Sequence, residues 1–406
     1  MKNKIYVAGM GPGFPTSVTE AALEVCRNAS CLIVAKRHEI LFPEHKNKIL
    51  LGELSELREI IKKELEKGNV AVAVSGDPGI YSLMAYIKRT MTGEEIIALP
   101  GISSLQSIFA TAQESWNDAC ILSGHGKKIT SEKLLGSVRK NRKCAFFCGT
   151  DKNPSWVCET IKNSSLSGIK VYIGENLSYP EERISVGSPE ELAGGEYDSL
   201  SIMVIINENF VPHRSSRPKD DEFIRTEVPM TREEVRSVVT DKLEIGPESC
   251  IWDLGAGTGS VTVACALQAD EGSVYAVEKK HEAVELIKKN IEKFRLCNVT
   301  VYEGNALEKL GELPLPTHVF IGGSGSELEA VLRYIAELGN GIKVVVTGVT
   351  LKTNAVAYEV LTGSKYRNFD AVQLSVSKAR KLGSSHIMTA QNPITIMSAE
   401  TVKENL

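Results

Sequence analysis

The chain of 406 residues lacks the marks of several protein classes. It has no run of about 18 uncharged apolar residues, so we expect no membrane-spanning helix. The apolar stretch near the start is too short for a secretory signal. Nine cysteines include no C-x-x-C pair, and we expect no metal site. These absences favour a cytoplasmic protein with buried free thiols, among them Cys31, Cys144, Cys148, Cys250 and Cys265.

A strong charge of either sign is also missing. The 47 basic and 51 acidic residues leave a net charge of −4, which argues against wholesale nucleic-acid binding. With 42% hydrophobic and 24% charged residues, the composition is typical of a globular protein. The length exceeds that of one ordinary core and predicts two domains.

A glycine-rich turn stands between an apolar run and a helix-forming stretch in the C-terminal half. Residues 250–253 fit a buried parallel strand, Asp253-Leu-Gly-Ala-Gly-Thr-Gly259 forms the turn, and a helix is expected from Ser260. Glycine is needed where the backbone turns tightly and a ligand comes close. The G-x-G-x-G spacing differs from the G-x-G-x-x-G of dinucleotide-binding proteins, and a turn without a ligand is the alternative.

Two further strands bring polar residues toward this turn. Strand 273–277 ends at Glu278, where an acid can accept both hydroxyls of a ribose, and strand 299–302 leads into Asn305. Together these elements resemble the class I methyltransferases, which bind S-adenosylmethionine in a Rossmann-like domain with a seven-stranded mixed sheet. The resemblance implies cofactor contacts from Gly255, Ala256, Gly257, Thr258 and Gly259 to the methionine half, from Glu278 to the ribose, and from Asn305 and Ala306 to the adenine.

Three loops rich in glycine and proline follow predicted strands in the N-terminal half. They are G-M-G-P-G at 9–13, S-G-D-P-G at 75–79 and P-G-I-S-S at 100–104. The set resembles the tetrapyrrole methylase family, over residues 3–207. That family has two α/β subdomains and uses S-adenosylmethionine. The implied cofactor contacts are Gly9, Gly11, Pro12, Gly13, Gly76, Asp77, Ile80, Ser103 and Ser104. The alternative for Asp77 is a cap on the helix expected near Tyr81.

For two other residues, His125 and Thr231, the sequence allows either a ligand contact or a role without a ligand. His125 follows a predicted strand at a place where tetrapyrrole methylases begin their substrate side, and a surface histidine without a role is the alternative. Thr231 and Glu234 predict a capping box for a helix. In one class I subfamily a threonine at this place also contacts the cofactor. Residues 208–226 have few apolar anchors, so we interpret them as a linker between domains 1–207 and 227–406.

The stretch from Ala371 to Ala399 contains no aspartate or glutamate. It holds four basic or titratable residues close together, and such a positive field favours carboxylates. A solvated hairpin tip is the alternative. With V-P-M-T at 228–231 and glycines at 322–325, this tail resembles the decarboxylating C15-methyltransferases of cobalamin synthesis, over about 225–400. The implied substrate contacts are Gly322, Gly323, Ser324, Lys378, Arg380 and Lys381, with Arg380 or His386 assisting catalysis.

The two resemblances agree when they are joined. A tetrapyrrole methylase followed by a decarboxylating class I enzyme is the arrangement of the bifunctional precorrin-6B C5,15-methyltransferase family. It implies one S-adenosylmethionine per domain, an anionic tetrapyrrole substrate, a homo-oligomer, and neither nucleic acid nor membrane as partner. One alternative is a methyltransferase of an RNA or a translation factor. Another is a tetrapyrrole carrier whose cofactor loops are vestigial.

Overall fold

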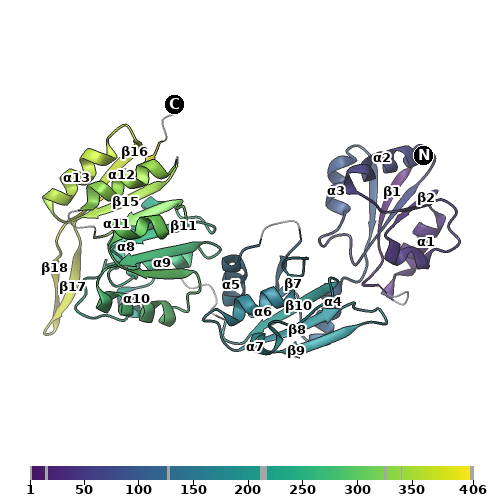
Figure 1. Cartoon of the computed structure of the whole chain (residues 1–406), viewed down its shortest axis with the longest axis horizontal. Helices are drawn as coiled ribbons and strands as arrows, with labels where there is room; N and C mark the ends of the chain where they lie inside the picture. Colours follow the sequence, from purple (N-terminus) through teal and green to yellow (C-terminus); the bar gives the residue numbers. More distant parts are fainter. Residues whose placement is uncertain are drawn as a thin grey trace. The chain divides into compact units, whose positions relative to one another are not determined.

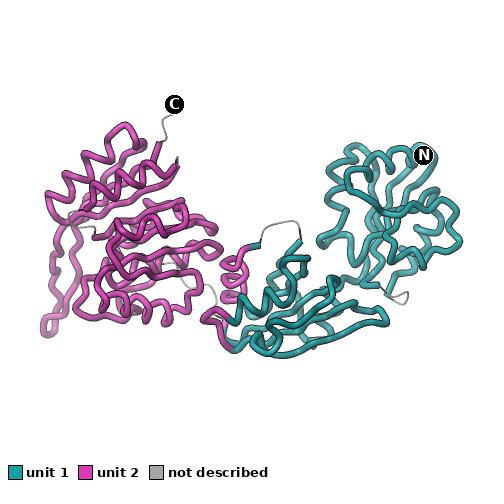
Figure 2. The backbone as a smooth tube through the Cα atoms, in the orientation of Figure 1, with its two compact units in different colours: residues 1–129, 141–162, 168–209 teal, residues 130–140, 163–167, 210–406 magenta. Residues whose placement is uncertain are grey.

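The computed structural model describes residues 2–13, 17–125, 129–210, 217–323, 327–339 and 341–402. The chain divides into two compact units (Figure 2). Unit 1 comprises residues 1–129, 141–162 and 168–209, and unit 2 comprises residues 130–140, 163–167 and 210–406. Among the described residues, no helix is long and apolar enough to cross a membrane.

The first sheet of unit 1 is parallel, with strand order β3-β2-β4-β1-β5. Its apolar runs, such as the fully buried Val70–Val74, form strands because both faces are covered. The strands are β1 (Lys4–Gly9), β2 (Cys31–Val34), β3 (Lys48–Leu50), β4 (Val70–Val74) and β5 (Glu95–Leu99). The accompanying helices are α1 (Glu20–Asn28), η2 (Lys36–Leu41), α2 (Leu54–Leu65) and α3 (Met84–Thr90). Thr19 caps α1, since its side chain accepts a hydrogen bond from the Ala22 N–H.

The second sheet of unit 1 is mixed, with strand order β6-β7-β10-β8-β9. Its strands are β6 (Cys120–Ser123), β7 (Lys143–Phe147), β8 (Ile169–Glu175), β9 (Arg183–Gly187) and β10 (Ser201–Asn207). Helices α4 (Ser104–Ala112), α6 (Pro154–Lys162) and α7 (Pro189–Leu192) accompany it. Ser103 and Gln106 form a capping box at the start of α4, and Leu105 and Phe109 pack against the sheet. The two predicted α/β subdomains are therefore confirmed.

Unit 2 contains a seven-stranded sheet with order β13-β12-β11-β14-β15-β19-β16. All pairs are parallel except those that β19 makes with β15 and β16, which confirms the predicted mixed sheet. Its strands are β11 (Cys250–Leu254), β12 (Ser273–Glu278), β13 (Val299–Glu303), β14 (His318–Ile321), β15 (Lys343–Gly348), β16 (Tyr366–Leu374) and β19 (Ile394–Thr401). Its helices include α8 (Glu233–Leu243), α9 (Ser260–Gln268), α10 (His281–Lys293), α11 (Ala306–Lys309), α12 (Leu328–Leu338) and α13 (Leu351–Leu361). Two apolar clusters, one built around Val331 and one around Val263, form its core.

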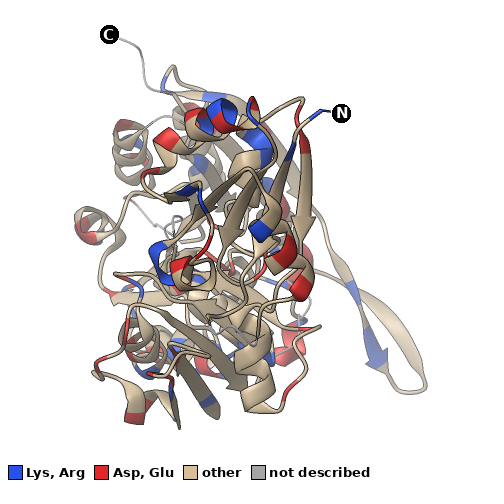
Figure 3. Cartoon of the chain, turned by 90° about the vertical axis from the view of Figure 1, so that its right-hand side faces the viewer, with Lys and Arg blue, Asp and Glu red and all other residues tan. Residues whose placement is uncertain are grey.

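A two-stranded ribbon, β17 (Ser377–Leu382) and β18 (Ser385–Ala390), extends from the seven-stranded sheet (Figure 1). It contains the basic part of the acid-free tail, and Figure 3 shows lysine and arginine on it but no acidic residue. Nearly all of its residues are exposed. The backbone therefore forms an exposed hairpin, and the substrate contacts of its basic side chains stay a prediction.

Helix α5 (Ser131–Lys140) groups with unit 2, although its sequence lies between strands of unit 1. Lys133 and Lys140 each place their amino group 2.5 Å from a carboxylate, that of Glu271 and of Asp270 respectively. Gly136 lies against the Asp270 carbonyl, where a Cβ would clash. A helix from far upstream therefore holds the turn between α9 and β12.

The nine cysteines are all free thiols. Cys31, Cys144, Cys148 and Cys265 are buried as predicted, whereas Cys250 is half-buried. Burial raises the pKa of the Cys148 thiol to about 12, which suppresses the reactive thiolate.

Candidate cofactor and substrate sites

A cavity of about 360 Å³ opens in unit 1, where the loops after β4 and before α4 meet residues of the second sheet. Seven predicted residues line it: Pro12, Gly76, Asp77, Ile80, Ser103, Ser104 and His125. His125 is exposed at its edge. The structure thus brings all three glycine- and proline-rich loops to one place.

Hydrogen bonds tie these loops together. The Gly76 N–H donates to the Gly11 carbonyl over 2.7 Å. The Asp77 carboxylate accepts from the Gly79 N–H at 2.7 Å and the Gly101 N–H at 3.1 Å. Asp77 caps no helix, because α3 begins only at Met84, so that alternative is wrong.

The glycines of the first loop lie behind the cavity. A Cβ at Gly9 would stand 2.6 Å from the Gly76 carbonyl and 2.8 Å from the Gly101 nitrogen. Gly11 has φ +66°, and Gly13 leaves room for the ring of Tyr179. These glycines let three backbones meet, and their contact with a cofactor stays a prediction.

Sequence reasoning missed several residues that line this cavity, among them Arg37, Ser75 and Tyr81. Ser75 is the first residue of the S-G-D-P-G loop at 75–79, so the sequence pattern could have indicated it. Arg37 belongs to no motif and reaches the cavity only through the fold. Tyr81 packs edge-on against Phe147, with ring centroids 5.1 Å apart.

The glycine-rich turn of unit 2 connects β11 to α9. Gly255, Gly257 and Gly259 have φ of +75°, +58° and +75°, which disfavours other residues. A Cβ at Gly255 would also lie 2.7 Å from the carbonyl oxygen of Gly323, at the end of β14. The Glu278 carboxylate accepts from the Gly257 N–H at 2.9 Å. An acid and a turn of three positive-φ glycines therefore lie side by side, and their contact with the ribose of a cofactor stays a prediction.

Two polar groups behind this turn are buried without a hydrogen-bond partner among the described residues: the Thr258 hydroxyl and one carboxylate oxygen of Asp253. The other Asp253 oxygen accepts from the Thr262 hydroxyl. Desolvation is the main reason why the pKa of Asp253 rises to about 7. Such unsatisfied groups are costly in a core and are typical of the wall of a ligand site.

Asn305 and Ala306, which the resemblance assigns to the adenine, already take part in other contacts within the protein. The Asn305 oxygen caps α11, and its amide donates to the Glu327 carboxylate at 3.0 and 2.9 Å. Ala306 is the first residue of α11. Gly322 and Gly323 are exposed at the end of β14, and Ser324 lies outside the described residues.

A second cavity, of about 680 Å³, lies at the base of the β17–β18 ribbon. Thr231, Lys378 and Arg380 line it, as does Arg232, which sequence reasoning missed. Arg232 and Arg380 are exposed, and no ion pair is recorded for either among the described residues. Lys381 and His386 face each other across the ribbon and do not line the cavity. Two guanidinium groups therefore border one cavity, an arrangement suited to carboxylates.

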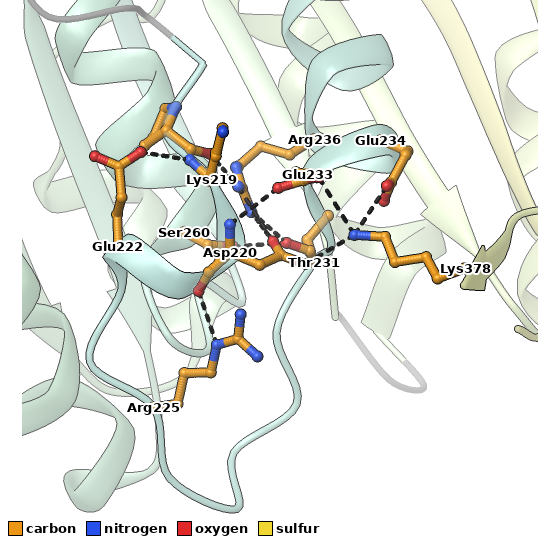
Figure 4. A network of polar contacts seen from close by, with 11 residues as sticks. Lys219, Asp220, Glu222, Arg225, Thr231, Glu233, Glu234, Arg236, Ser260 and Lys378 are labelled. Carbon is orange, nitrogen blue, oxygen red and sulfur yellow. Dashed lines mark hydrogen bonds and ion pairs between the residues drawn. The ribbon is translucent and has the colours of Figure 1, made fainter. Parts of the chain in front are cut away.

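Lys378 is held by acidic residues of its own unit (Figure 4). Its amino group lies 2.8 Å from Glu234, 3.4 Å from Glu233 and 3.6 Å from Asp220. The hydrogen bond to Glu234 is the main reason why the pKa of Lys378 is raised. The positive charge of Lys378 is thus largely balanced within the protein, and its role as a substrate ligand stays a prediction.

The predicted capping box at Thr231 is wrong. Helix α8 begins at Glu233 with Arg232 as its cap residue, and no side chain caps it. The Thr231 carbonyl instead accepts from Arg236 at 2.6 Å and from Ser260 at 3.3 Å. Glu234 is engaged by Lys378. Tertiary contacts have replaced the local cap.

Two family models match, one in each half of the chain. The tetrapyrrole (corrin/porphyrin) methylases match residues 4–193, and a precorrin methyltransferase domain matches residues 222–401. A probable cobalt-precorrin-6B C15-methyltransferase (decarboxylating) of Sulfurisphaera tokodaii is 39% identical over 184 residues, 45% of this chain and 95% of the relative. A probable cobalt-precorrin-7 C5-methyltransferase of Methanocaldococcus jannaschii is 33% identical over 205 residues, 49% of this chain and 96% of the relative.

A solved structure titled precorrin-6y C5,15-methyltransferase, from Geobacter metallireducens, is 33% identical, covers 46% of this chain and 97% of that one, and has a TM-score of 0.43. The two curated relatives bear different names, and this chain covers 95% of one and 96% of the other. From its two family matches and its relatives, this chain belongs to the precorrin methyltransferases of cobalamin biosynthesis and joins a tetrapyrrole methylase domain to a precorrin methyltransferase domain.

Proposed function

We propose that this chain methylates C5 and C15 of a precorrin or cobalt-precorrin and removes the ring C acetate as carbon dioxide. The observation that supports this most is that one polypeptide spans 95% of a C15-methyltransferase and 96% of a C5-methyltransferase. C5 methylation takes place at the cavity of unit 1, and C15 methylation with decarboxylation takes place in unit 2. An RNA or translation-factor methylase has no comparable support.

Each unit binds one S-adenosylmethionine in this proposal. In unit 2 the residues present fit this cofactor, because a turn of three positive-φ glycines without side chains lies beside Glu278. In unit 1 the fit rests on the cavity that collects Gly76, Asp77, Ser103 and Ser104. When bound, the cofactor supplies an electrophilic methyl group on sulfur.

The protein's main task is alignment. Enamine-like carbons of a reduced tetrapyrrole are already nucleophilic, so no strong base is required to activate them. Holding the carbon, methyl and sulfur in line can contribute about 7–11 kcal/mol relative to free encounter. Gly322 and Gly323 leave an open, exposed strand end beside the glycine turn, which suits a flat ring.

Decarboxylation requires that the acetate be held while its C–C electrons pass into the conjugated ring and carbon dioxide leaves. Arg380 and Arg232 line the second cavity, which supports their binding of a carboxylate, and His386 lies farther along the ribbon. Lys381 adds positive charge on the same ribbon. We propose that the chain works in the cytoplasm as a homo-oligomer, on a small anionic tetrapyrrole rather than on nucleic acid or a membrane.

Calorimetric titration of the whole chain with S-adenosylhomocysteine tests the two-site proposal, with Gly257→Arg as the variant. Arginine at φ +58° is strained and would fill the turn beside Glu278. We expect two sites in the wild type and one in the variant. A single site in the wild type that the variant abolishes would remove the C5 assignment from unit 1.

A further inference from the structure

A buried histidine lies directly behind the cavity of unit 1. His38, on η2, has no solvent exposure, and its Nε2 lies 2.8 Å from the hydroxyl oxygen of Ser75. Ser75 lines the cavity. The second ring nitrogen of His38, Nδ1, is buried and has no partner among the described residues.

This geometry fixes the state of the imidazole. Burial, with a smaller contribution from the charge of Arg37, lowers the pKa of His38 to about 4, so the ring is neutral at physiological pH. A neutral imidazole carries one N–H proton, on either Nδ1 or Nε2. A buried N–H without an acceptor is rarer in proteins than an unpaired acceptor, so the proton resides on Nε2 rather than on the unpartnered Nδ1. His38 therefore donates its hydrogen bond to Ser75.

A serine oxygen that already accepts from His38 points its own O–H elsewhere. Ser75 is half-exposed and faces the cavity, so its hydroxyl is available as a donor there. Arg37 lines the same cavity and adds a positive charge. Among the described residues that line the cavity, Asp77 is the one with an acidic side chain. Its carboxylate already accepts hydrogen bonds from two backbone N–H groups.

We propose that Ser75 and Arg37 form a carboxylate subsite in unit 1, with His38 as the positioning residue that orients the Ser75 hydroxyl. The subsite deepens the proposed function and rests on it. Two carboxylates have the right chemistry: the one at the amino-acid end of the cofactor and an acetate or propionate of the tetrapyrrole. Both would accept a hydrogen bond from serine and an ion pair from arginine.

The test uses the full chain carrying Gly257→Arg, so that only the site of unit 1 is titrated. Ser75→Ala and Arg37→Met are compared by calorimetry with S-adenosylhomocysteine and with 5′-methylthioadenosine, which lacks the amino-acid carboxylate. If the cofactor is the source, each variant weakens S-adenosylhomocysteine binding about tenfold and leaves methylthioadenosine binding unchanged. If the substrate is the source, both titrations are unchanged, and KM for the tetrapyrrole rises about tenfold with kcat retained.

His38 variants separate orientation from simple packing. His38→Gln can keep an N–H donor near Ser75 and should retain most of the affinity, whereas His38→Leu should match the loss seen in Ser75→Ala. Ser55→Ala, at an exposed position of α2, is the matched control. If both ligands and KM are unaffected by Ser75→Ala and Arg37→Met, the subsite is refuted while the proposed function stands. If the Gly257→Arg chain binds no S-adenosylhomocysteine, the proposed cofactor site of unit 1 falls, and this inference with it.

Discussion

Replacing Arg236 with methionine tests the buried network at the start of α8. Arg236 is 2% exposed, and its guanidinium lies 3.3 Å from the Asp220 carboxylate and 4.7 Å from the ring centre of Phe223. It also donates to the Pro218 carbonyl at 2.5 Å and the Thr231 carbonyl at 2.6 Å. This one side chain therefore joins the segment before α8 to the helix itself.

The expected loss follows from what the substitution leaves behind. Removing one partner of a buried ion pair costs about 3–5 kcal/mol. Methionine restores part of the contact with Phe223, and Lys378 remains 3.6 Å from Asp220 to balance its charge. The two carbonyls lose a donor, which costs about 1–3 kcal/mol for each one that water does not reach. We expect the free energy of unfolding of unit 2 to fall by about 3–4 kcal/mol.

Tryptophan fluorescence during urea unfolding can measure this loss in one unit at a time. The chain has three tryptophans, and Trp252 in β11 is the one in unit 2. Phenylalanine at Trp116 and Trp156 leaves Trp252 as the reporter. Arg333→Met, on an exposed i,i+4 pair of α12, is the control and should cost less than about 0.5 kcal/mol.

A double-mutant cycle completes the experiment. Asp220→Asn combined with Arg236→Met should cost less than the sum of the two single substitutions, since no uncompensated buried charge remains. A loss below about 1 kcal/mol in Arg236→Met, or strict additivity in the cycle, would refute the reasoning.

Three further predictions concern the sites. Asp253 has its pKa raised to about 7 by burial, so the folded chain holds a proton that the unfolded chain releases above about pH 4. The stability of unit 2 should therefore fall as pH rises from 4 to 7, and Asp253→Asn should flatten that decline in urea titrations across this range. Gly255→Ala meets both a positive φ and the Gly323 carbonyl, so calorimetry should lose one of two S-adenosylhomocysteine sites; two intact sites would contradict the cofactor role of the turn. Arg380→Ala and Arg232→Ala should each lower carbon dioxide release or raise KM for the tetrapyrrole by about tenfold, with cofactor affinity retained; unchanged turnover in both would exclude them from the substrate site.

The parts of the fold that sequence predicted well are those encoded locally. The strand before Asp253, the positive-φ glycines and the helix from Ser260 are adjacent in the chain, and each leaves its own composition signal. Glu278 follows from the same logic, because neighbouring parallel strands bring their ends to one edge of the sheet. The three loops of unit 1 were similarly marked by glycine and proline.

What sequence could not predict depends on residues that meet only after folding. The capping pattern at Thr231 was outcompeted by Arg236 and by Lys378, which comes from a ribbon more than a hundred residues downstream. Arg37 reaches the cavity, and His38 reaches Ser75, through the packing of η2, for which no motif exists. Charge alone likewise could not show that Lys378 meets three carboxylates while Arg380 meets none that the structure records.

The sharing of α5 bears on how a fused enzyme of this kind can be divided. Five crossings of the chain between its units mean that no single cut yields two polypeptides with the same boundaries as the units. Expression of the C-terminal half alone, from residue 217, would leave Asp270 and Glu271 without the two lysines of α5. Two halves made separately and mixed would therefore have to re-form these ion pairs between two polypeptides, whereas the intact chain forms them within one.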